Sequence, residues 1–341
     1  MSARQFFIFG EITLWSTLAK KAGNFYIYLY DLRYFGSSRI CGNVAGSTTA
    51  NPGQENLDRD VPLFFSGGWF MKFRAMISIL VVAAFFSACS TVPLTGRQQL
   101  NMAPDSLILS MSLQEYDQFL KQNQLSQDSV QTEMVKTVGH RIQKAVEVYM
   151  RENFIEDELK NYKWEFNLIE SKEINAWCMP GGKVVVYTGI LPITRDDTGL
   201  AVVMGHEIAH AVARHGNERM SQTLMVQMGG VALAVAMADQ PTETRNIMLG
   251  AFGVGSTVGF MLPFSRLHEN EADRMGLIFM AMAGYDPRMA VDFWQRMAQQ
   301  KGDKQKPPEF LSTHPSDQKR IENIQNLIPE AMTYYRKGGI R

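Results

Sequence analysis

The sequence predicts an α+β domain that is mainly helical and carries a small β-sheet beside one of its helices. Two patterns lead to this class. Apolar residues three and four positions apart are typical of amphipathic helices, and such stretches lie at 105–123, 127–152, 199–215 and 286–300. Short alternating or β-branched stretches are typical of strands, and these lie at 164–169, 175–179 and 183–187.

The composition excludes some classes of partner. The chain of 341 residues carries 34 basic and 34 acidic side chains, so its formal net charge is zero. This balance gives no reason to expect a nucleic-acid partner, because binding phosphates needs a basic surface. The hydrophobic fraction of 45% is ordinary for a globular protein.

The first part of the chain contains a targeting signal that lies unusually far from the N-terminus. Residues 1–70 show no sustained period, whereas 71–88 combine a basic start, an uncharged apolar run and small residues, as signal peptides do. The end of this segment resembles the lipobox of bacterial lipoproteins, with Cys89 as the lipidated residue. We therefore expect translation to begin at Met71 and 1–70 to be a non-native upstream extension. An unusual N-terminal domain before an internal apolar helix is the alternative.

The same interpretation divides the mature chain into two parts. Residues 89–104 contain two prolines and a glycine and are expected to form a lipidated N-terminus and a tether. Residues 105–341 are expected to form the folded domain. By the lipoprotein resemblance, Ser90 after the cysteine implies sorting to the outer membrane, where the domain would face the periplasm on its lipid anchor.

The most specific motif is His206-Glu207-Ile208-Ala209-His210. Residues four apart lie on one side of a helix, so His206 and His210 can offer two imidazole nitrogens to one metal ion. Glu207 lies about 100° around the helix, where it can hold a water molecule without being a ligand. A chain of this composition would contain about 0.01 such matches by chance. The motif therefore predicts a catalytic zinc site, and two buried structural histidines are the alternative.

A later predicted helix offers a third ligand. Catalytic zinc usually takes three protein ligands and leaves one position for water. Glu269 and Asp273 are four residues apart, so Glu269 can bind the ion while Asp273 accepts a hydrogen bond from a ligand histidine. Glu271 is the competing ligand, but it should face another side of the helix. His215 and His268 are interpreted as exposed or supporting residues rather than ligands.

A turn at 180–182 containing proline and two glycines indicates that the strands at 175–179 and 183–187 pair as a hairpin. If the outer edge of the first strand is free, Asn175, Ala176 and Trp177 can bind an extended peptide substrate through backbone hydrogen bonds. An ordinary hairpin strand fits the pattern equally well.

Two uncharged apolar runs, 224–238 and 246–264, separate the two halves of the predicted metal site. Each is near or below the shortest length that spans a membrane, and the second contains several glycines. We interpret them as a mobile helical hairpin that covers the active site. Membrane insertion is the alternative, because membrane helices also tolerate glycine.

His314 lies in Thr313-His314-Pro315, immediately before the last predicted helix. A residue before proline favours an extended conformation. His314 could then reach the metal site, as an electrophile towards the developing oxyanion or as a fourth ligand that blocks the site. A histidine in a helix-capping loop is the alternative.

Together these motifs resemble the zinc metallopeptidases grouped with HtpX and the CAAX prenyl proteases, and most closely their bacterial lipoprotein members. The resemblance covers about residues 90–336 and implies a zincin-type fold with one Zn²⁺ per chain. The residues it implies are the ligands His206, His210 and Glu269, the catalytic base Glu207 and the supporting carboxylate Asp273.

The sequence therefore predicts a zinc metalloendopeptidase that acts on protein or peptide substrates. Zinc lowers the pKa of bound water, and Glu207 would take the proton and pass it to the leaving amine. The resemblance also implies quality control of misfolded envelope proteins. The alternative is a non-catalytic periplasmic assembly factor or chaperone with a structural zinc site. Glu207 argues against it, because a structural site needs no base.

Overall fold

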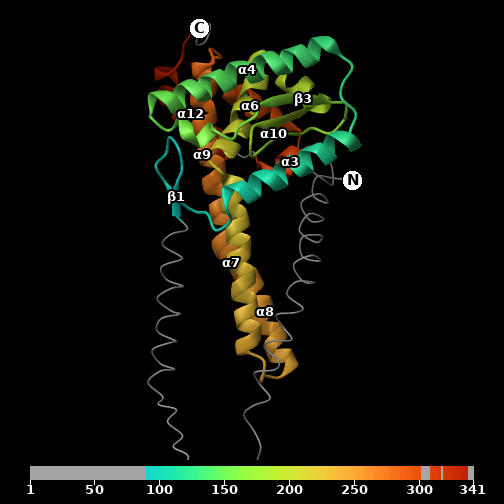
Figure 1. Cartoon of the computed structure of the whole chain (residues 1–341), viewed down its shortest axis with the longest axis vertical. Coiled ribbons are helices and arrows are strands. Elements are labelled where there is room, and N and C mark those ends of the chain that lie inside the picture. Colours follow the sequence, from blue (N-terminus) through green and yellow to red (C-terminus); the bar gives the residue numbers. More distant parts are fainter. Residues whose placement is uncertain (1–88, 301–307, 316–317, 337–341) are drawn as a thin grey trace, which may run out of the picture. The chain divides into compact units, whose positions relative to one another are not determined.

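The computed structural model of the chain describes residues 89–300, 308–315 and 318–336. All of them belong to the contact unit 75–341, and a second unit covers 1–74. The predicted upstream extension at 1–70 and signal peptide at 71–88 lie outside the described residues. The described elements, in chain order, are β1 (Cys89–Thr91), β2 (Gln98–Leu100), α3 (Asp105–Gln122), α4 (Ser129–Glu152), η1 (Glu156–Leu159), β3 (Glu165–Ile169), β4 (Ala176–Met179), β5 (Lys183–Tyr187), η2 (Thr188–Ile190), α5 (Leu191–Thr194), α6 (Asp197–Val212), α7 (His215–Ala236), α8 (Thr242–Ser256), η3 (Thr257–Met261), α9 (Leu262–Met282), α10 (Met289–Gln299), α11 (Glu309–Thr313) and α12 (Gln318–Thr333). The predicted α+β class is confirmed, since helices dominate and the sheets are small (Figure 1).

The first described residues form a hairpin that packs on the domain. β1 pairs antiparallel with β2, and Val92 in the connection is only 1% exposed. The Arg97 guanidinium donates hydrogen bonds to the carboxylates of Glu218 and Glu271. Residues 89–104, which were expected to form a tether, are therefore held against α7 and α9.

α3 and α4 lie close to their predicted positions. α3 begins at Asp105, so this residue lies in the first turn of the helix. Asp128 caps α4, because its carboxylate accepts hydrogen bonds from the amides of Val130 and Gln131. The 3.6-residue period of α4 buries one face of this helix in the core. Val130 is 78% exposed, because it lies in the first turn of α4.

The three-stranded sheet has the order β3-β5-β4. β3 runs parallel to β5, and β4 pairs antiparallel with β5 across the predicted turn. Gly181 and Gly182 have φ values of +89° and +82°, a backbone region that favours glycine. β4 is therefore an edge strand, and it packs against α6.

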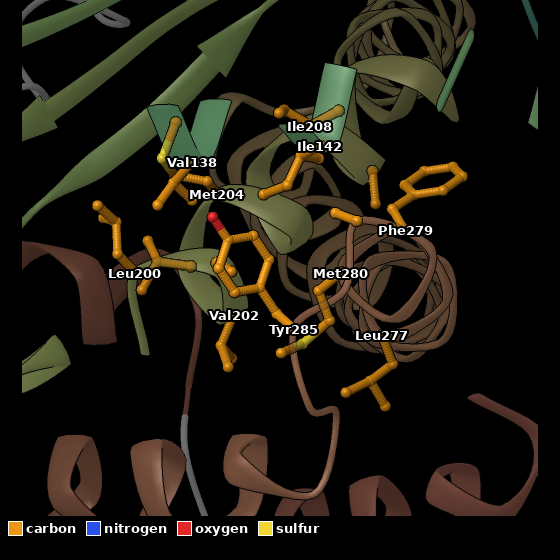
Figure 2. Close-up of a cluster of buried hydrophobic side chains, with 14 of the residues drawn as sticks. Val138, Ile142, Leu200, Val202, Met204, Ile208, Leu277, Phe279, Met280 and Tyr285 are labelled. Carbon is orange, nitrogen blue, oxygen red and sulfur yellow. The ribbon is translucent and has the colours of Figure 1, made fainter. Parts of the chain in front are cut away.

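α6 is the central helix of the domain. Its N-cap is Asp196, whose carboxylate accepts a hydrogen bond from the Gly199 amide at 2.8 Å. Every residue from Gly199 to Val212 is buried. A helix that is apolar on all sides must be surrounded, and α4, α9, α10 and β4 surround α6. Figure 2 shows part of this core, with side chains from α4, α6 and α9 that include Val138, Ile142, Leu200, Met204, Ile208, Leu277 and Phe279.

Two glycines let α6 and α9 approach closely. A Cβ on Gly205 would lie 2.9 Å from the carbonyl oxygen of Gly276, and a Cβ on Gly276 would lie 2.9 Å from the backbone of Gly205. Any larger side chain would push the helices apart. This contact places the motif on α6 against the acidic stretch of α9.

The two apolar runs form a helical hairpin made of the end of α7, α8, η3 and the start of α9. In Figure 1 α7 and α8 lie side by side and extend away from the sheet. No residue of α8 or η3 is buried, and α7 buries only residues in its first two turns. The hairpin therefore does not cover the site in this structure, contrary to our expectation.

α10, α11 and α12 are the last described elements of the domain. α12 packs its apolar face, including Ile321 and Ile324, against α9 and α10. α11 and the residues after it place His314 at the site, since Phe310 is fully buried and its ring centroid lies 4.8 Å from that of His314. The polar linker expected at 301–308 lies outside the described residues except for Pro308.

Candidate metal centre

The structure brings together three side chains that the sequence assigned to one metal ion. His206 Nε2 lies 3.1 Å from His210 Nε2, as their spacing on α6 predicts. Glu269 on α9 places one carboxylate oxygen 3.4 Å from His206 Nε2 and the other 3.3 Å from His210 Nε2. All three side chains are buried or nearly so.

His314 joins this group from the segment after α11. Its Nδ1 lies 3.2 Å from His206 Nε2 and 3.0 Å from each carboxylate oxygen of Glu269. One donor atom from each of the four residues falls within 4.8 Å of the others. His314 therefore lies at the site rather than only in a capping loop.

These donors fit zinc in spacing and in chemistry. Ligand atoms about 2.1 Å from a tetrahedral zinc ion are separated from one another by about 3.4 Å. The distances between His206, His210 and Glu269 are 3.1, 3.3 and 3.4 Å. Imidazole nitrogen and carboxylate oxygen are both ligands that zinc accepts.

Glu207 lies beside the donors without joining them. It is 4% exposed, and its Oε1 makes no hydrogen bond with any described residue, although His314 Nε2 lies 3.3 Å away. A buried carboxylate oxygen without a partner is unfavourable unless a water molecule or ligand binds it. Burial raises the pKa of Glu207 above its ordinary value.

Asp273 contacts the first histidine of the motif. Its Oδ1 lies 3.0 Å from His206 Nδ1, so the other ring nitrogen of His206 faces the donor group. Burial favours the neutral ring, but the Asp273 and Glu269 carboxylates outweigh it and raise the pKa of His206 to about 9.

Arg320 on α12 is a site residue that the sequence analysis missed. Its guanidinium donates to both oxygens of Asp273, at 2.9 and 2.7 Å, and lies 3.1 Å from Glu269 Oε2. It also stacks 3.6 Å above the centroid of the Trp294 ring. The arginine balances two buried carboxylates, and its position beside an apolar helix face gave no signal in the sequence.

A second buried network supports His210. His215 Nδ1 lies 2.8 Å from His210 Nδ1, and His215 Nε2 lies 3.0 Å from Glu271 Oε2. Arg97 and Thr95 of the N-terminal hairpin donate to the same Glu271 carboxylate. Glu271 thus faces away from the four donor residues, as its position two residues from Glu269 indicates.

His268 belongs to this network through Glu218. Its Nε2 lies 2.9 Å from Glu218 Oε2, and its ring stacks on that of His215 with centroids 4.4 Å apart. His215 and His268 are both 1% exposed. Neither is exposed, and both act as supporting side chains in this arrangement.

The candidate substrate strand lies next to α6. Asn175 precedes β4 and its side-chain oxygen accepts a hydrogen bond from the Ala176 amide. The Trp177 ring packs edge-on against Phe119, with centroids 4.9 Å apart. Within the part of the chain that the structure describes, β4 pairs with β5 on one side and with no strand on the other.

Comparison with known sequences identifies the family. The model of peptidase family M48 matches residues 138–328, which include all four donor residues. The chain belongs to peptidase family M48. The predictions of a metallopeptidase and of a zinc cofactor are therefore confirmed at the level of the family.

Several M48 relatives carry names that describe their activity. The chain is 42% identical over 173 residues to the mitochondrial metalloendopeptidase OMA1 of Schizosaccharomyces pombe, which is 51% of this chain and 49% of the relative. It is 29% identical over 293 residues to OMA1 of Saccharomyces cerevisiae, covering 80% and 82% of the two chains. It is 27% identical over 257 residues to the beta-barrel assembly-enhancing protease of Escherichia coli, covering 72% and 49%. The chain thus spans about half the length of the first and third relatives.

These relatives correct two predictions. The predicted location, an outer-membrane lipoprotein facing the periplasm, is contradicted, because the Schizosaccharomyces, Saccharomyces and cattle relatives are mitochondrial enzymes. The lipobox-like segment before Cys89 led to this error, and a short apolar run next to a cysteine is a weak signal by itself. The narrower resemblance to bacterial lipoprotein members, and with it the lipid anchor, is not supported.

Proposed function

We propose that this chain is a zinc metalloendopeptidase in which His206, His210 and Glu269 hold the metal and Glu207 is the catalytic base. The observation that carries the proposal is the buried Oε1 of Glu207, which accepts no hydrogen bond from the described residues and lies beside three donor atoms at zinc-ligand spacing. A metallopeptidase needs both features, because one group polarises the carbonyl and the other moves the proton.

The side chains divide the work of peptide hydrolysis. When bound, zinc supplies a Lewis acid for the substrate carbonyl and lowers the pKa of water. Glu207 accepts the proton of the attacking water at Oε1 and donates it to the leaving nitrogen. The pKa of Glu207, raised by burial, favours the first step, because a stronger base takes the proton of the water more readily.

His314 has two possible roles, and the geometry supports one of them better. Its Nδ1 faces the same point as the donor atoms of His206 and Glu269, at 3.2 and 3.0 Å. We propose that His314 acts as a fourth ligand in this conformation and must leave before a peptide carbonyl can bind. The His314→Ala variant should then keep zinc and gain initial hydrolysis rate; a loss of rate with zinc retained would favour the electrophile role instead.

The free edge of β4 is the proposed binding site for the substrate backbone. In the register with β5, the Cys178 backbone groups point to the outer side, where an extended peptide can pair with them. β4 packs on the helix that carries Glu207, so a peptide on this edge would pass close to the base. Asn175, Ala176 and Trp177 would line the start of this strand.

A second function has one observation in its favour. A structural zinc site usually closes with four protein ligands, and His314 completes such a set. The chain would then be an assembly factor or chaperone that does not cleave its clients. The buried Glu207 has no role in such a chaperone, and we therefore rank this function second. A role in quality control rests on resemblance alone.

Substitution of the base separates the two functions. Glu207→Gln should bind one zinc ion with unchanged affinity and lose hydrolysis of an unfolded protein substrate by at least a factor of about 10². Glu147→Gln, on the exposed face of α4, is the matched control and should behave like the wild type. Undiminished cleavage by Glu207→Gln would refute the assigned role, and equal cellular complementation by both proteins would favour the chaperone.

A further inference from the structure

The apolar hairpin, defined as residues 224–264, exposes large hydrophobic side chains to an unusual extent. The runs 224–238 and 246–264 contain no Asp, Glu, Lys or Arg. Several side chains in these runs are more than half exposed: Met228 at 59%, Val231 at 62%, Val235 at 58%, Ile247 at 64%, Val254 at 66% and Val258 at 60%. Scattered single apolar residues are normal on a protein surface, but a continuous surface of this kind indicates an interaction site.

The hairpin has no polar face along its two arms. The first run contains Gln227 as its single polar residue, and the second contains Asn246, Ser256 and Thr257. A helix that docks in a protein groove keeps one face polar for solvent, whereas a helix surrounded by lipid is apolar on every side. The lack of a polar face therefore favours lipid over a protein groove.

The two hydroxyl groups of the second run are satisfied within the helix. Ser256 Oγ donates to the Gly253 carbonyl at 3.1 Å, and Thr257 Oγ1 donates to the same carbonyl at 2.8 Å. Inside a bilayer no water is present to hydrogen-bond such hydroxyls, so this internal pairing is what lipid requires.

The lengths of the arms match a bilayer approximately. At about 1.5 Å per residue, the first run reaches about 22 Å and the second about 28 Å, against a hydrocarbon core of about 30 Å. Among the described residues, one helix, Thr242–Met282, is long and apolar enough to cross a membrane, and none of its most apolar window is buried. The charged residues Asp239, Glu243 and Arg245 lie in and beside the turn between the arms, where they can contact polar headgroups or water.

The two arms pack on each other through a small residue. A Cβ on Gly229 would lie 2.9 Å from the Phe252 ring, so this glycine lets α7 and α8 come together. Close approach at small residues is how helices associate in lipid, where no hydrophobic force drives them together. The hairpin can thus keep its shape without support from the rest of the domain.

We propose that the apolar hairpin inserts into a lipid bilayer and holds the metal centre at the membrane surface. α7 leaves the domain directly after the motif helix, and α9 returns from the hairpin to Glu269 without a break. The centre therefore lies at the base of the inserted segment, and peptides at the membrane surface are the substrates within reach. This last point rests on the proposed peptidase function, but the insertion itself does not.

A fluorescent label at a defined position tests the insertion in the full chain. Cys41, Cys89 and Cys178 are replaced by serine, and an environment-sensitive fluorophore is attached to Val254→Cys in the hairpin or to Val130→Cys on α4. Both positions are exposed, at 66% and 78%, so neither substitution removes packing. The probe membrane is a vesicle of phosphatidylethanolamine and phosphatidylglycerol that carries a quencher on its acyl chains.

The expected result is a blue shift and strong quenching of the label at position 254, with no change for the label at position 130. A label at 254 that stays in water would overturn the proposal, whether the chain binds the vesicles or not. A blue shift without vesicles that grows with protein concentration would also overturn it, since the hairpin would then pair with a second copy. Peptidase activity is not part of this readout, so the proposed function can fail independently.

Discussion

Hydrogen bonds connect the N-terminal hairpin to His210 through Glu271 and His215. They predict that Glu271, which faces away from the four donor residues, affects the zinc affinity of the site. If His210 binds the ion through Nε2, its Nδ1–H donates to His215 Nδ1 at 2.8 Å. His215 must then carry its proton on Nε2 and donate it to Glu271 at 3.0 Å. Arg97 fixes that carboxylate with two hydrogen bonds, at 3.0 and 2.9 Å.

Glu271→Gln tests this link because the amide keeps the shape and removes the charge. The amide is a weaker acceptor for His215, and it can present a donor where Arg97 requires an acceptor. Groups that orient a metal-bound histidine typically contribute a factor of about 10 to 100 in metal affinity. We therefore expect zinc to bind 10 to 100 times more weakly, which is about 1.4 to 2.7 kcal/mol. The stoichiometry should remain one ion per chain.

Competition with a chromophoric chelator at fixed pH measures the zinc dissociation constant. Glu330→Gln is the matched control, because Glu330 pairs with Arg274 at the surface from a side chain that is 36% exposed. Glu269→Gln provides the opposite extreme, because a proposed ligand is itself lost. An unchanged dissociation constant in correctly folded Glu271→Gln would refute the reasoning, and a loss as large as that of Glu269→Gln would make Glu271 a ligand.

Three other predictions concern stability. Gly205→Ala places a Cβ 2.9 Å from the carbonyl oxygen of Gly276. It should lower the free energy of unfolding in urea by about 1–3 kcal/mol and weaken zinc binding. Normal stability would show that the helices can separate freely. Arg320→Met leaves Asp273 without its cation and should lower the free energy of unfolding by about 3–5 kcal/mol, with a larger loss in the zinc-free protein than in the zinc-bound protein. Equal losses in the two states would contradict this prediction. Burial alone would raise the pKa of Glu218, but its partners, chiefly His268 and Arg97, lower it to about 2, below the unfolded value of about 4.5. The stability from this carboxylate is therefore present above pH 4.5 and lost as the pH falls towards 2, so the melting temperature should fall more steeply in the wild type than in Glu218→Gln over that interval.

The local elements and the principal site residues were predictable because each depends on short-range spacing. His206 and His210 share a helix face by geometry alone, and Glu269 and Asp273 share another. The pairing of β4 with β5 followed from a turn that needs glycine.

The long-range parts were not predictable from one sequence. Arg320 lies 47 residues from Asp273, and Arg97 lies 174 residues from Glu271, so no local pattern joins them. The hairpin was expected to cover the site because an apolar surface normally seeks burial within the protein. The structure leaves that surface exposed, and this exposure led us to propose that lipid covers it.

The glycine contact between α6 and α9 also determines when the enzyme can become active. One half of the donor set comes from α6, and the carboxylate comes from a helix more than fifty residues later, so neither half can retain the ion tightly alone. A partly synthesised or partly folded chain therefore has no hydrolytic power. Completion of the fold therefore has to precede any hydrolysis by this site.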